Sequence, residues 1–222
     1  MTAVLTSLVF EVVGGCGGHP GERVRAHLGE RDVQVLEALD AAAVRRWYLW
    51  GLEALESARD EINSLNVFPV PDADTGTNLH LTLESAVQPD AGERAIPDSA
   101  DLAGTATEMA RLALLGARGS SGVILSQLLR GVAEALAAER RPPRGRGLTR
   151  ALERASALAY AAVSHPVEGT MLTVARAAAQ AARATGSDDL HVVAEAAATA
   201  ARRALAVTPE QLDVLGRAGV VD

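Results

Sequence analysis

The sequence predicts an all-α protein, from its composition and from apolar side chains that recur at helical spacing. The 222 residues include 44 alanines, whereas aromatic residues make up only 3%. Alanine is the strongest helix former, and strands are richer in β-branched and aromatic residues. Hydrophobic residues account for 48% of the chain. A chain of this length and hydrophobic content can bury a full-sized core, as one domain or at most two. The same content excludes intrinsic disorder for most of the chain.

The start of the chain differs in composition and in hydrophobic periodicity from the helical segments that follow. It is rich in glycine and shows no clear hydrophobic period. We therefore expect residues 1–32 to be a loose N-terminal extension and residues 33–222 to form the domain. The opening apolar run carries Glu11 and has no basic residue before it, so we do not expect a signal peptide.

The first firm helix is expected over 41–62. Val44 and Leu55 belong to a set of apolar residues that recur on one helical face. Pro69 and Pro71 then exclude a helix and bias the residues before them to extended conformations. This extended segment leads into an acidic turn that contains glycine, residues 72–76.

Helical spacing returns after this turn and is interrupted by proline, glycine and arginine-rich stretches, including a break over 89–97. Residues 140–147 (RRPPRGRG) should form a solvated connector. Gly186 should end a helix in the C′ position, and Thr208 should open the last helix as the N-cap of a capping box. Short loops between seven or eight helices describe an antiparallel bundle. The later helices are expected over 77–87, 99–115, 121–138, 149–163, 170–185 and 188–206, with the last starting at 208.

Charge and cysteine content exclude several classes of function. All 21 basic residues are arginine, so a Walker-type phosphate loop, a protein-kinase strand lysine and a Schiff base are excluded. A net charge of −7 argues against binding nucleic acid or an anionic membrane by bulk electrostatics. The single cysteine, Cys16, forbids an intramolecular disulfide and fits a reducing cytoplasm. No segment approaches the roughly 18 apolar residues of a membrane span.

The first chemically distinctive loop is DADTGTN, residues 72–78. Asp72 and Asp74 are two apart on a non-helical loop, so they point to the same side and could share a hard cation. Oxygen ligands without nearby cysteine favour Mg²⁺ over zinc. A calcium EF-hand is excluded because glycine stands at the fifth position instead of the sixth and Leu83 replaces the bidentate glutamate. The alternative is that the two aspartates only cap the following helix.

Two further loops lead directly into helices. GARGSSG (116–122) places Ser120, Ser121 and Gly122 at a positive helix end, which can seat a phosphate or can be ordinary N-cap chemistry. HPVEGT (165–170) also feeds a helix N-terminus. In a chain without lysine, a cation loop with two such helix starts is what a Mg²⁺–nucleotide site requires, because the metal supplies the missing positive charge. The scattered histidines predict neither a metal cluster nor a catalytic triad.

Three runs carry a family resemblance: LNVFPVPDADTGTNL (65–79), GARGSSGVILSQLLRG (116–131) and HPVEGTMLTVAR (165–176). They are similar to the signatures of the DhaL-like (dihydroxyacetone kinase L-type) nucleotide-binding domain. The form resembled is the one at the N-terminus of the bacterial fatty-acid kinase ATP-binding subunit. The end of the chain, TPEQLDVLGRAGVVD, resembles the end of that domain, so the likeness covers residues 35–222.

The resemblance implies a barrel of eight antiparallel helices with Mg²⁺ and ATP, or ADP, at one end. By position, Asp72 and Asp74 would be Mg²⁺ ligands and the residues that act in catalysis. Asn66 would join them as a ligand, through an alignment that needs a gap. The implied contacts to phosphates or nucleotide are Thr75, Thr77, Asn78, Gly119, Ser120, Ser121, Gly122, Thr170 and Met171.

The implied activity is phosphorylation of the carboxylate of a fatty acid presented by a separate lipid-binding protein. That carboxylate is ionised near neutral pH, so no general base is needed. Two alternatives stay open. One is a dihydroxyacetone-kinase-type (glycerone kinase) subunit that holds ADP and takes part in phosphotransfer. The other is a truncated nucleotide-binding or scaffolding remnant without turnover.

The chain departs from the family pattern at several positions. Ala73 stands where glycine is usual, and alanine takes positive φ less readily, so the loop geometry could differ. Ser120 replaces asparagine and His165 replaces a common lysine. Full-length family members continue past the position of Asp222 into middle and C-terminal regions that serve dimerisation and acyl-carrier binding, so we expect partner recognition to be absent from this chain. A homodimer is the further partner considered.

Overall fold

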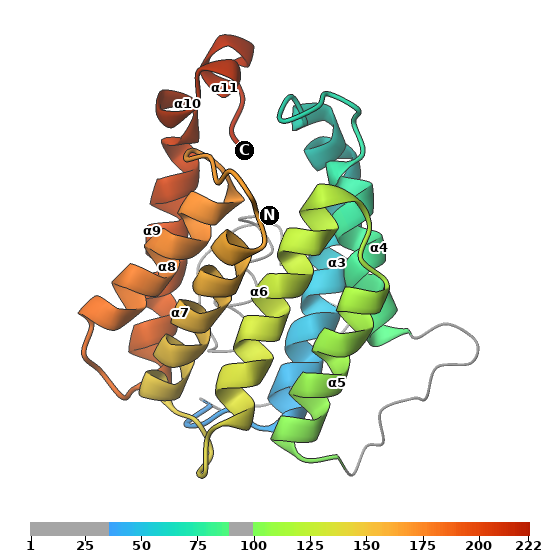
Figure 1. Ribbon diagram of the computed structural model, residues 1–222. Helices are drawn as coiled ribbons and strands as arrows, with labels where there is room; N and C mark the ends of the chain where they lie inside the picture. The colour runs from blue at the N-terminus through green and yellow to red at the C-terminus, as the bar shows by residue number, and fades with distance from the viewer. Residues whose placement is uncertain (1–35, 89–99) are drawn as a thin grey trace.

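The computed structural model describes residues 36–88 and 100–222, and every regular element in these ranges is a helix. The all-α prediction is therefore confirmed. Figure 1 shows the long helices running up and down in alternation along the chain. Their bounds are α3 Ala41–Leu65, α4 Thr75–Val87, α5 Leu102–Leu115, α6 Gly119–Ala137, α7 Gly145–Ala161, α8 Met171–Ala184 and α9 Leu190–Ala206, followed by the short α10 Thr208–Gln211 and α11 Asp213–Ala218.

The helices pack in two groups that α6 joins. α3, α4 and α5 contact one another, α6 packs on α4 and α5 and also on α7, and α7 packs on both α8 and α9. The larger core cluster includes Tyr48, Leu79 and Leu136, and the smaller one lies among α7, α8 and α9 around Val193. Many alanines in the smaller cluster allow close helix contacts, which is why an alanine-rich chain folds into closely packed helices.

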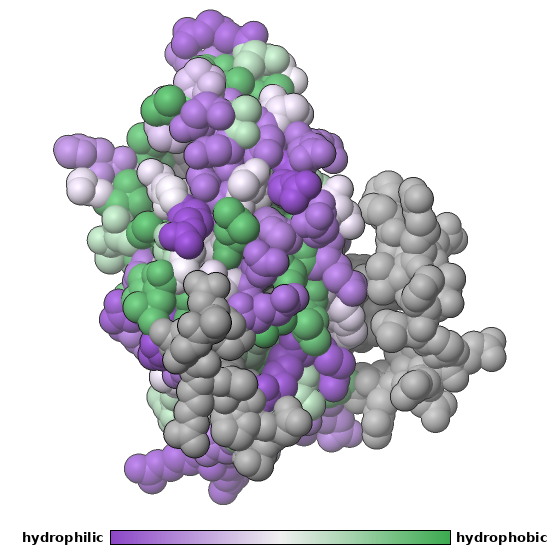
Figure 2. Space-filling model, turned by 90° about the vertical axis from the view of Figure 1, so that its right-hand side faces the viewer, coloured by the Kyte–Doolittle hydropathy of each residue, from purple (hydrophilic) through white to green (hydrophobic). Residues whose placement is uncertain are grey.

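Within residues 36–88 and 100–222, no extensive packing joins α3 to α9. A closed barrel of eight helices therefore stays a prediction. The expected loose extension over 1–32 and the whole of the expected break over 89–97 lie outside the described residues. None of the described helices is long and apolar enough to cross a membrane. On the face that Figure 2 shows, hydrophilic and hydrophobic side chains are interspersed, as is normal for a surface in contact with water.

Two local predictions were wrong. The helix expected from residue 149 begins at Gly145, inside the expected connector, because the backbone N–H of Gly145 donates to the carbonyl of Asp188 at 3.0 Å. A Cβ at this glycine would overlap the backbone that follows α8. The capping box at Thr208 does not form, since Val207 occupies the N-cap position and the Thr208 hydroxyl donates to the carbonyl of Leu205. Gly186, with φ of 60°, ends α8 as predicted.

Candidate nucleotide site

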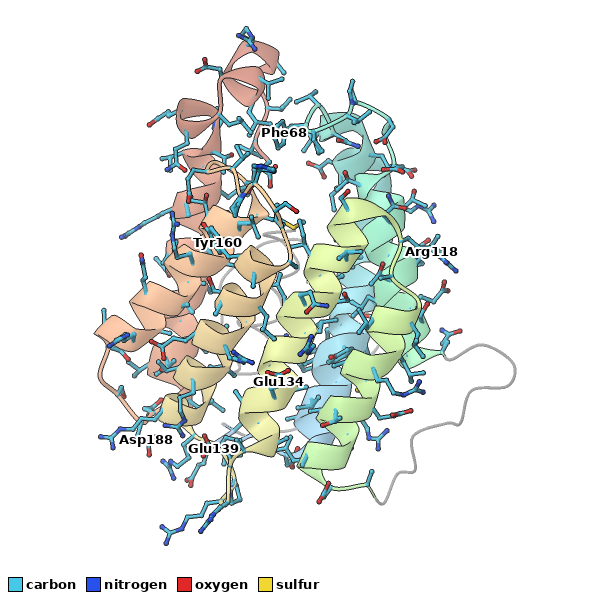
Figure 3. The ribbon with its side chains drawn as sticks, in the orientation of Figure 1. Phe68, Arg118, Glu134, Glu139, Tyr160 and Asp188 are labelled. Carbon is cyan, nitrogen blue, oxygen red and sulfur yellow. The ribbon has the colours of Figure 1, made fainter. Side chains whose placement is uncertain are left out.

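The three chemically distinctive loops lie at one end of the molecule. Because successive helices alternate in direction, the α3–α4, α5–α6 and α7–α8 connections all fall at the upper end in Figure 1, together with α10, α11 and the C-terminus. In Figure 3, Phe68, Arg118 and Tyr160 mark the three connections at this loop end. The topology thus brings together segments that are about 50 residues apart in sequence.

The two aspartates of the first loop are exposed, and neither carboxylate caps α4. Asp74 occupies the N-cap position, yet its side chain accepts no capping hydrogen bond. The carboxylate of Asp72 accepts a hydrogen bond from the Asn66 amide, Nδ2 to Oδ1 at 2.8 Å. The capping alternative therefore does not account for these carboxylates, and at least one of them keeps its oxygens for another partner.

Asn66 supplies an observation that fits a cation. Its Oδ1 is buried and has no hydrogen-bond partner within the described residues. A buried polar oxygen without a partner is costly, and a bound ion is one way to satisfy it. No three His, Cys, Asp or Glu side chains come together as a metal site in the described ranges. The candidate donor set is therefore two aspartates and one amide oxygen, a hard oxygen set of the kind that Mg²⁺ takes.

Ala73 adopts the left-handed conformation that glycine would favour. Its φ is 55°, and it is the one non-glycine residue with positive φ in the described ranges. The loop thus keeps the conformation expected for a central glycine, at an energetic cost that falls on the alanine. The concern that alanine alters the backbone at this position is not supported.

The first loop is locked to the end of α3 by contacts that sequence reasoning missed. Asn63 donates from Nδ2 to the Thr77 hydroxyl at 3.0 Å and accepts from the Thr77 backbone N–H at 3.1 Å. Gly76 packs so closely that a Cβ would overlap the carbonyl oxygen of Arg59. The Thr77 N–H therefore helps to fix the start of α4. Its hydroxyl oxygen accepts from Asn63, so the hydroxyl proton can still be donated to another group. The clustering of asparagines around this loop was the available signal.

The second loop meets the first directly. α6 begins at Gly119, two residues earlier than predicted, and a Cβ at Gly119 would overlap the amide nitrogen of Asn78. The Thr82 hydroxyl connects the same elements, because it donates to the Asn78 carbonyl at 2.6 Å and accepts from the Arg118 N–H at 3.0 Å. Thr82 was not predicted, since its role depends on a contact across 36 residues.

The start of α6 can offer backbone donors to an anion. Gly119, Ser120 and Ser121 form its first turn, whose N–H groups have no acceptor within the helix. No side chain caps this helix end. The N–H of Gly122 is already used, since it donates to the Arg118 carbonyl at 2.9 Å. Of the predicted cradle over 119–122, the first three residues therefore keep free backbone donors and Gly122 does not.

The third loop is held by Glu168. Its carboxylate accepts two hydrogen bonds from the Arg176 guanidinium, at 2.7 and 2.6 Å, and one from the Thr173 hydroxyl at 2.5 Å. The Tyr160 hydroxyl donates to both carboxylate oxygens at 3.2 and 3.3 Å, and Arg176 also lies over its ring. The hydrogen bonds from Arg176, and then from Thr173, lower the pKa of Glu168 despite partial burial.

The residues after Glu168 are largely buried. Thr170 caps α8, with its hydroxyl accepting from the Leu172 N–H and donating to the Val167 carbonyl. Met171 is also buried, and its backbone lies beside the carboxylate of Asp222. Burial raises the pKa of Asp222 to about 6. The structure thus brings Asp222, which the sequence did not single out, to the third loop.

The histidines in the described ranges do not converge. His80 lies on α4 with its Nε2 2.8 Å from a carboxylate oxygen of Glu56, and His191 lies on α9, 3.8 Å from Glu195. His165 is exposed in the third loop. No three His, Cys, Asp or Glu side chains gather as a metal site around them within the described ranges, and the expectation that the histidines form no metal cluster stays a prediction.

Comparison with known proteins identifies the family. The family model of the DAK2 domain matches residues 69–222. The chain is 39% identical over 195 residues to protein YloV of Bacillus subtilis strain 168, which covers 84% of this chain and 33% of the relative. It is 40% identical over 176 residues to an uncharacterized protein of Staphylococcus aureus strain USA300, covering 78% of this chain and 31% of the relative.

The chain spans about a third of the length of the curated relatives it matches. The resemblance drawn from the three loops is confirmed by these matches. In this family the domain binds ATP or ADP and is of the phosphotransferase type. The chain belongs to the DAK2 domain family, the nucleotide-binding domain of the dihydroxyacetone kinase type.

Proposed function

We propose that this chain is a Mg²⁺- and ATP-binding phosphotransferase domain that phosphorylates the carboxylate of a fatty acid presented by a separate lipid-binding protein. The observation that carries the metal and nucleotide part is the first loop. Its two exposed aspartates do not cap α4, the Asn66 amide donates to Asp72 from Nδ2, and the Oδ1 of the same amide is buried without a partner. The acyl substrate, its carrier and a cytoplasmic location come from the family resemblance and the single cysteine.

In this proposal Asp72, Asp74 and Asn66 hold Mg²⁺, which when bound supplies positive charge beside the phosphates. The first-turn N–H groups at 119–121 and the Asn78 amide donate to phosphate oxygens. The fatty carboxylate oxygen forms a bond to the γ-phosphorus as the bond to the ADP oxygen breaks, so the products are an acyl phosphate and ADP. The carboxylate enters ionised, and the protein's task is to orient it and offset charge.

The test is calorimetric titration of the purified chain with ATP, with and without Mg²⁺, on wild type and on Asp72→Asn. Tight binding that needs Mg²⁺ and falls at least about 100-fold in the variant is expected, a loss typical of removing a ligand from a metal site. Asp60→Asn removes a carboxylate that is 90% exposed on α3 and should bind like wild type. Normal binding by Asp72→Asn would show that the metal assignment is wrong.

The family match also favours a second function, that of a dihydroxyacetone-kinase-type subunit that holds ADP. Denaturing the purified chain and analysing the released nucleotide distinguishes the two. Stoichiometric ADP carried through purification would favour the ADP-holding subunit. Exchangeable ATP with turnover only when acyl-loaded carrier is added would favour the acyl kinase. Binding without turnover in either assay would identify a nucleotide-binding remnant.

A further inference from the structure

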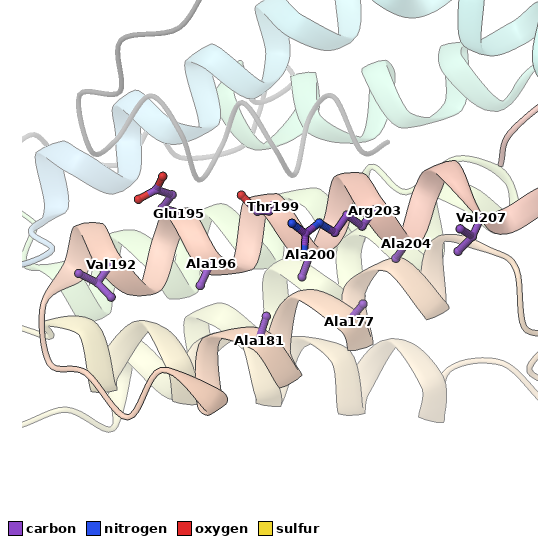
Figure 4. Close-up of a pocket in the computed structure, with 10 residues that line it drawn as sticks. All are labelled: Ala177, Ala181, Val192, Glu195, Ala196, Thr199, Ala200, Arg203, Ala204 and Val207. Carbon is purple, nitrogen blue, oxygen red and sulfur yellow. The ribbon is translucent and has the colours of Figure 1, made fainter.

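An apolar groove runs along α8 and α9. It has a volume of about 680 Å³ and extends along α9 from Val192 to Val207, as Figure 4 shows. Most of its lining consists of small apolar side chains, none of them fully buried. They are Ala177 and Ala181 on α8, and Ala196, Ala200 and Ala204 on α9.

This lining favours a helix as the occupant. Val192, Ala196, Ala200 and Ala204 follow one another at intervals of four residues, so they form one continuous ridge on α9. Side chains as short as alanine let a second helix axis approach to the close end of the usual 8–10 Å range. Val192 is 45% exposed, so apolar area is available for burial there.

The charged residues of the groove indicate which helix fits. Glu195 and Arg203 both line it, and each lies four residues from Thr199, on opposite sides. Four residues of helix span about 6 Å, so the two charges are placed symmetrically about the middle of α9. The groove therefore carries one negative and one positive group with no net charge, a pattern that suits neither a polyanion nor a simple cation.

We propose that the groove is the contact surface of a homodimer in which the α9 helices of two copies cross antiparallel at Thr199. In a contact with two-fold rotational symmetry, a residue on one helix meets the residue that lies equally far on the other side of the axis in the second copy. Glu195 of one copy then faces Arg203 of the other, and the same pair forms again on the far side of the axis. The groove is thus complementary to itself in charge. This surface contains none of the residues proposed to hold Mg²⁺ or nucleotide, and the proposal does not depend on the proposed activity.

The test is sedimentation equilibrium of the full chain over a wide range of concentrations, without nucleotide. A reversible monomer–dimer equilibrium is expected. Arg203→Glu turns two attractive contacts into two repulsive ones, and should raise the dimer Kd at least about tenfold. Arg140→Glu makes the same charge change in the α6–α7 connection, outside the groove, and should leave the Kd within about twofold of wild type.

The decisive variant combines Glu195→Arg with Arg203→Glu, because exchanging the charges restores complementarity and should bring the Kd back toward wild type. Thr199→Glu places two like charges at the axis and gives an independent disruption. Far-UV circular dichroism of each variant confirms that it is folded. The proposal is overturned if wild type stays monomeric, if Arg203→Glu dimerises normally, or if the folded double variant remains as dissociated as Arg203→Glu.

Discussion

The carboxylates of the first loop and those on the surface where α6 meets α7 differ in their partners. On that surface Glu134 accepts from both Arg130 and Arg154, and Glu139 is held by Arg150. In Figure 3, Glu134 and Glu139 lie well below the loop end. At the loop end, Asp72 and Asp74 form no ion pair with an arginine among the described residues.

The α6–α7 surface uses its carboxylates for stability, and the proposed binding role of the first loop would account for carboxylates without an arginine partner. Hydrogen bonds, chiefly from Arg154, lower the pKa of Glu134 and tie α6 to α7. The first loop instead keeps uncapped carboxylates, a left-handed alanine and an amide oxygen without a partner. Unfavourable local features of this kind persist where function requires them and the surrounding structure holds them in place.

The largest expected effects come from two tightly packed glycines, one in each region. A Cβ at Gly76 would overlap the Arg59 carbonyl, and a Cβ at Gly131 would overlap the backbone of Ala155 where α6 crosses α7. Each glycine-to-alanine change should lower the free energy of unfolding by about 2 kcal/mol, measured in urea. Only Gly76→Ala should also weaken nucleotide binding in calorimetry, since it displaces the first loop. Equal loss of binding in both variants would contradict the distinction between the regions.

A smaller effect of opposite sign is expected at Ala73. Ala73→Gly removes the cost of holding alanine at φ of 55°, which exceeds the entropic cost of glycine in the unfolded chain. The variant should gain about 1 kcal/mol of unfolding free energy in urea denaturation and keep its nucleotide affinity. Ala138→Gly, at the end of α6 with φ of −78°, is the control and should lose stability. A loss at Ala73 would show that the loop is not strained.

The smallest effect on stability is expected when either of the two arginine-paired glutamates, Glu168 or Glu134, is replaced by the neutral glutamine. Glu168 and Glu134 both have lowered pKa values, so the stability they contribute is present above the ordinary glutamate pKa and is lost as the pH falls through their folded values. Glu168→Gln and Glu134→Gln should each cost below about 1 kcal/mol at pH 7, because both carboxylates are partly exposed. Thermal unfolding from pH 7 to pH 3 should show each difference shrinking toward zero. A difference that grows on acidification would contradict the assignment.

The sequence predicted the features that depend on local patterning. The helices themselves follow from the spacing of apolar residues such as Val44 and Leu55. The alternation of helix direction along the chain then places all three loops at one end. The two aspartates were recognisable because a D-x-D turn after two prolines is a local signal. Their roles as ligands stay a prediction.

Other contacts could not be predicted because they join residues that are distant in sequence. The hydrogen bond from Arg118 to Thr82 and the insertion of Gly145 against Asp188 depend on how whole helices pack. Glu168 lies within the third loop, yet its role required knowing that Tyr160 and Arg176 approach it from α7 and α8. Such contacts follow from tertiary structure and leave no periodic trace in the sequence.

The packing of Gly119 against the Asn78 amide makes the first and second loops one mechanical unit. A ligand that orders one loop must also restrict the other, so the free energies of occupying the two are linked. If Mg²⁺ and ATP bind as proposed, the factor by which Mg²⁺ tightens ATP binding equals the factor by which ATP tightens Mg²⁺ binding. The close approach of Gly119 to the Asn78 amide would then be one route by which the cation loop and the phosphate loop influence each other.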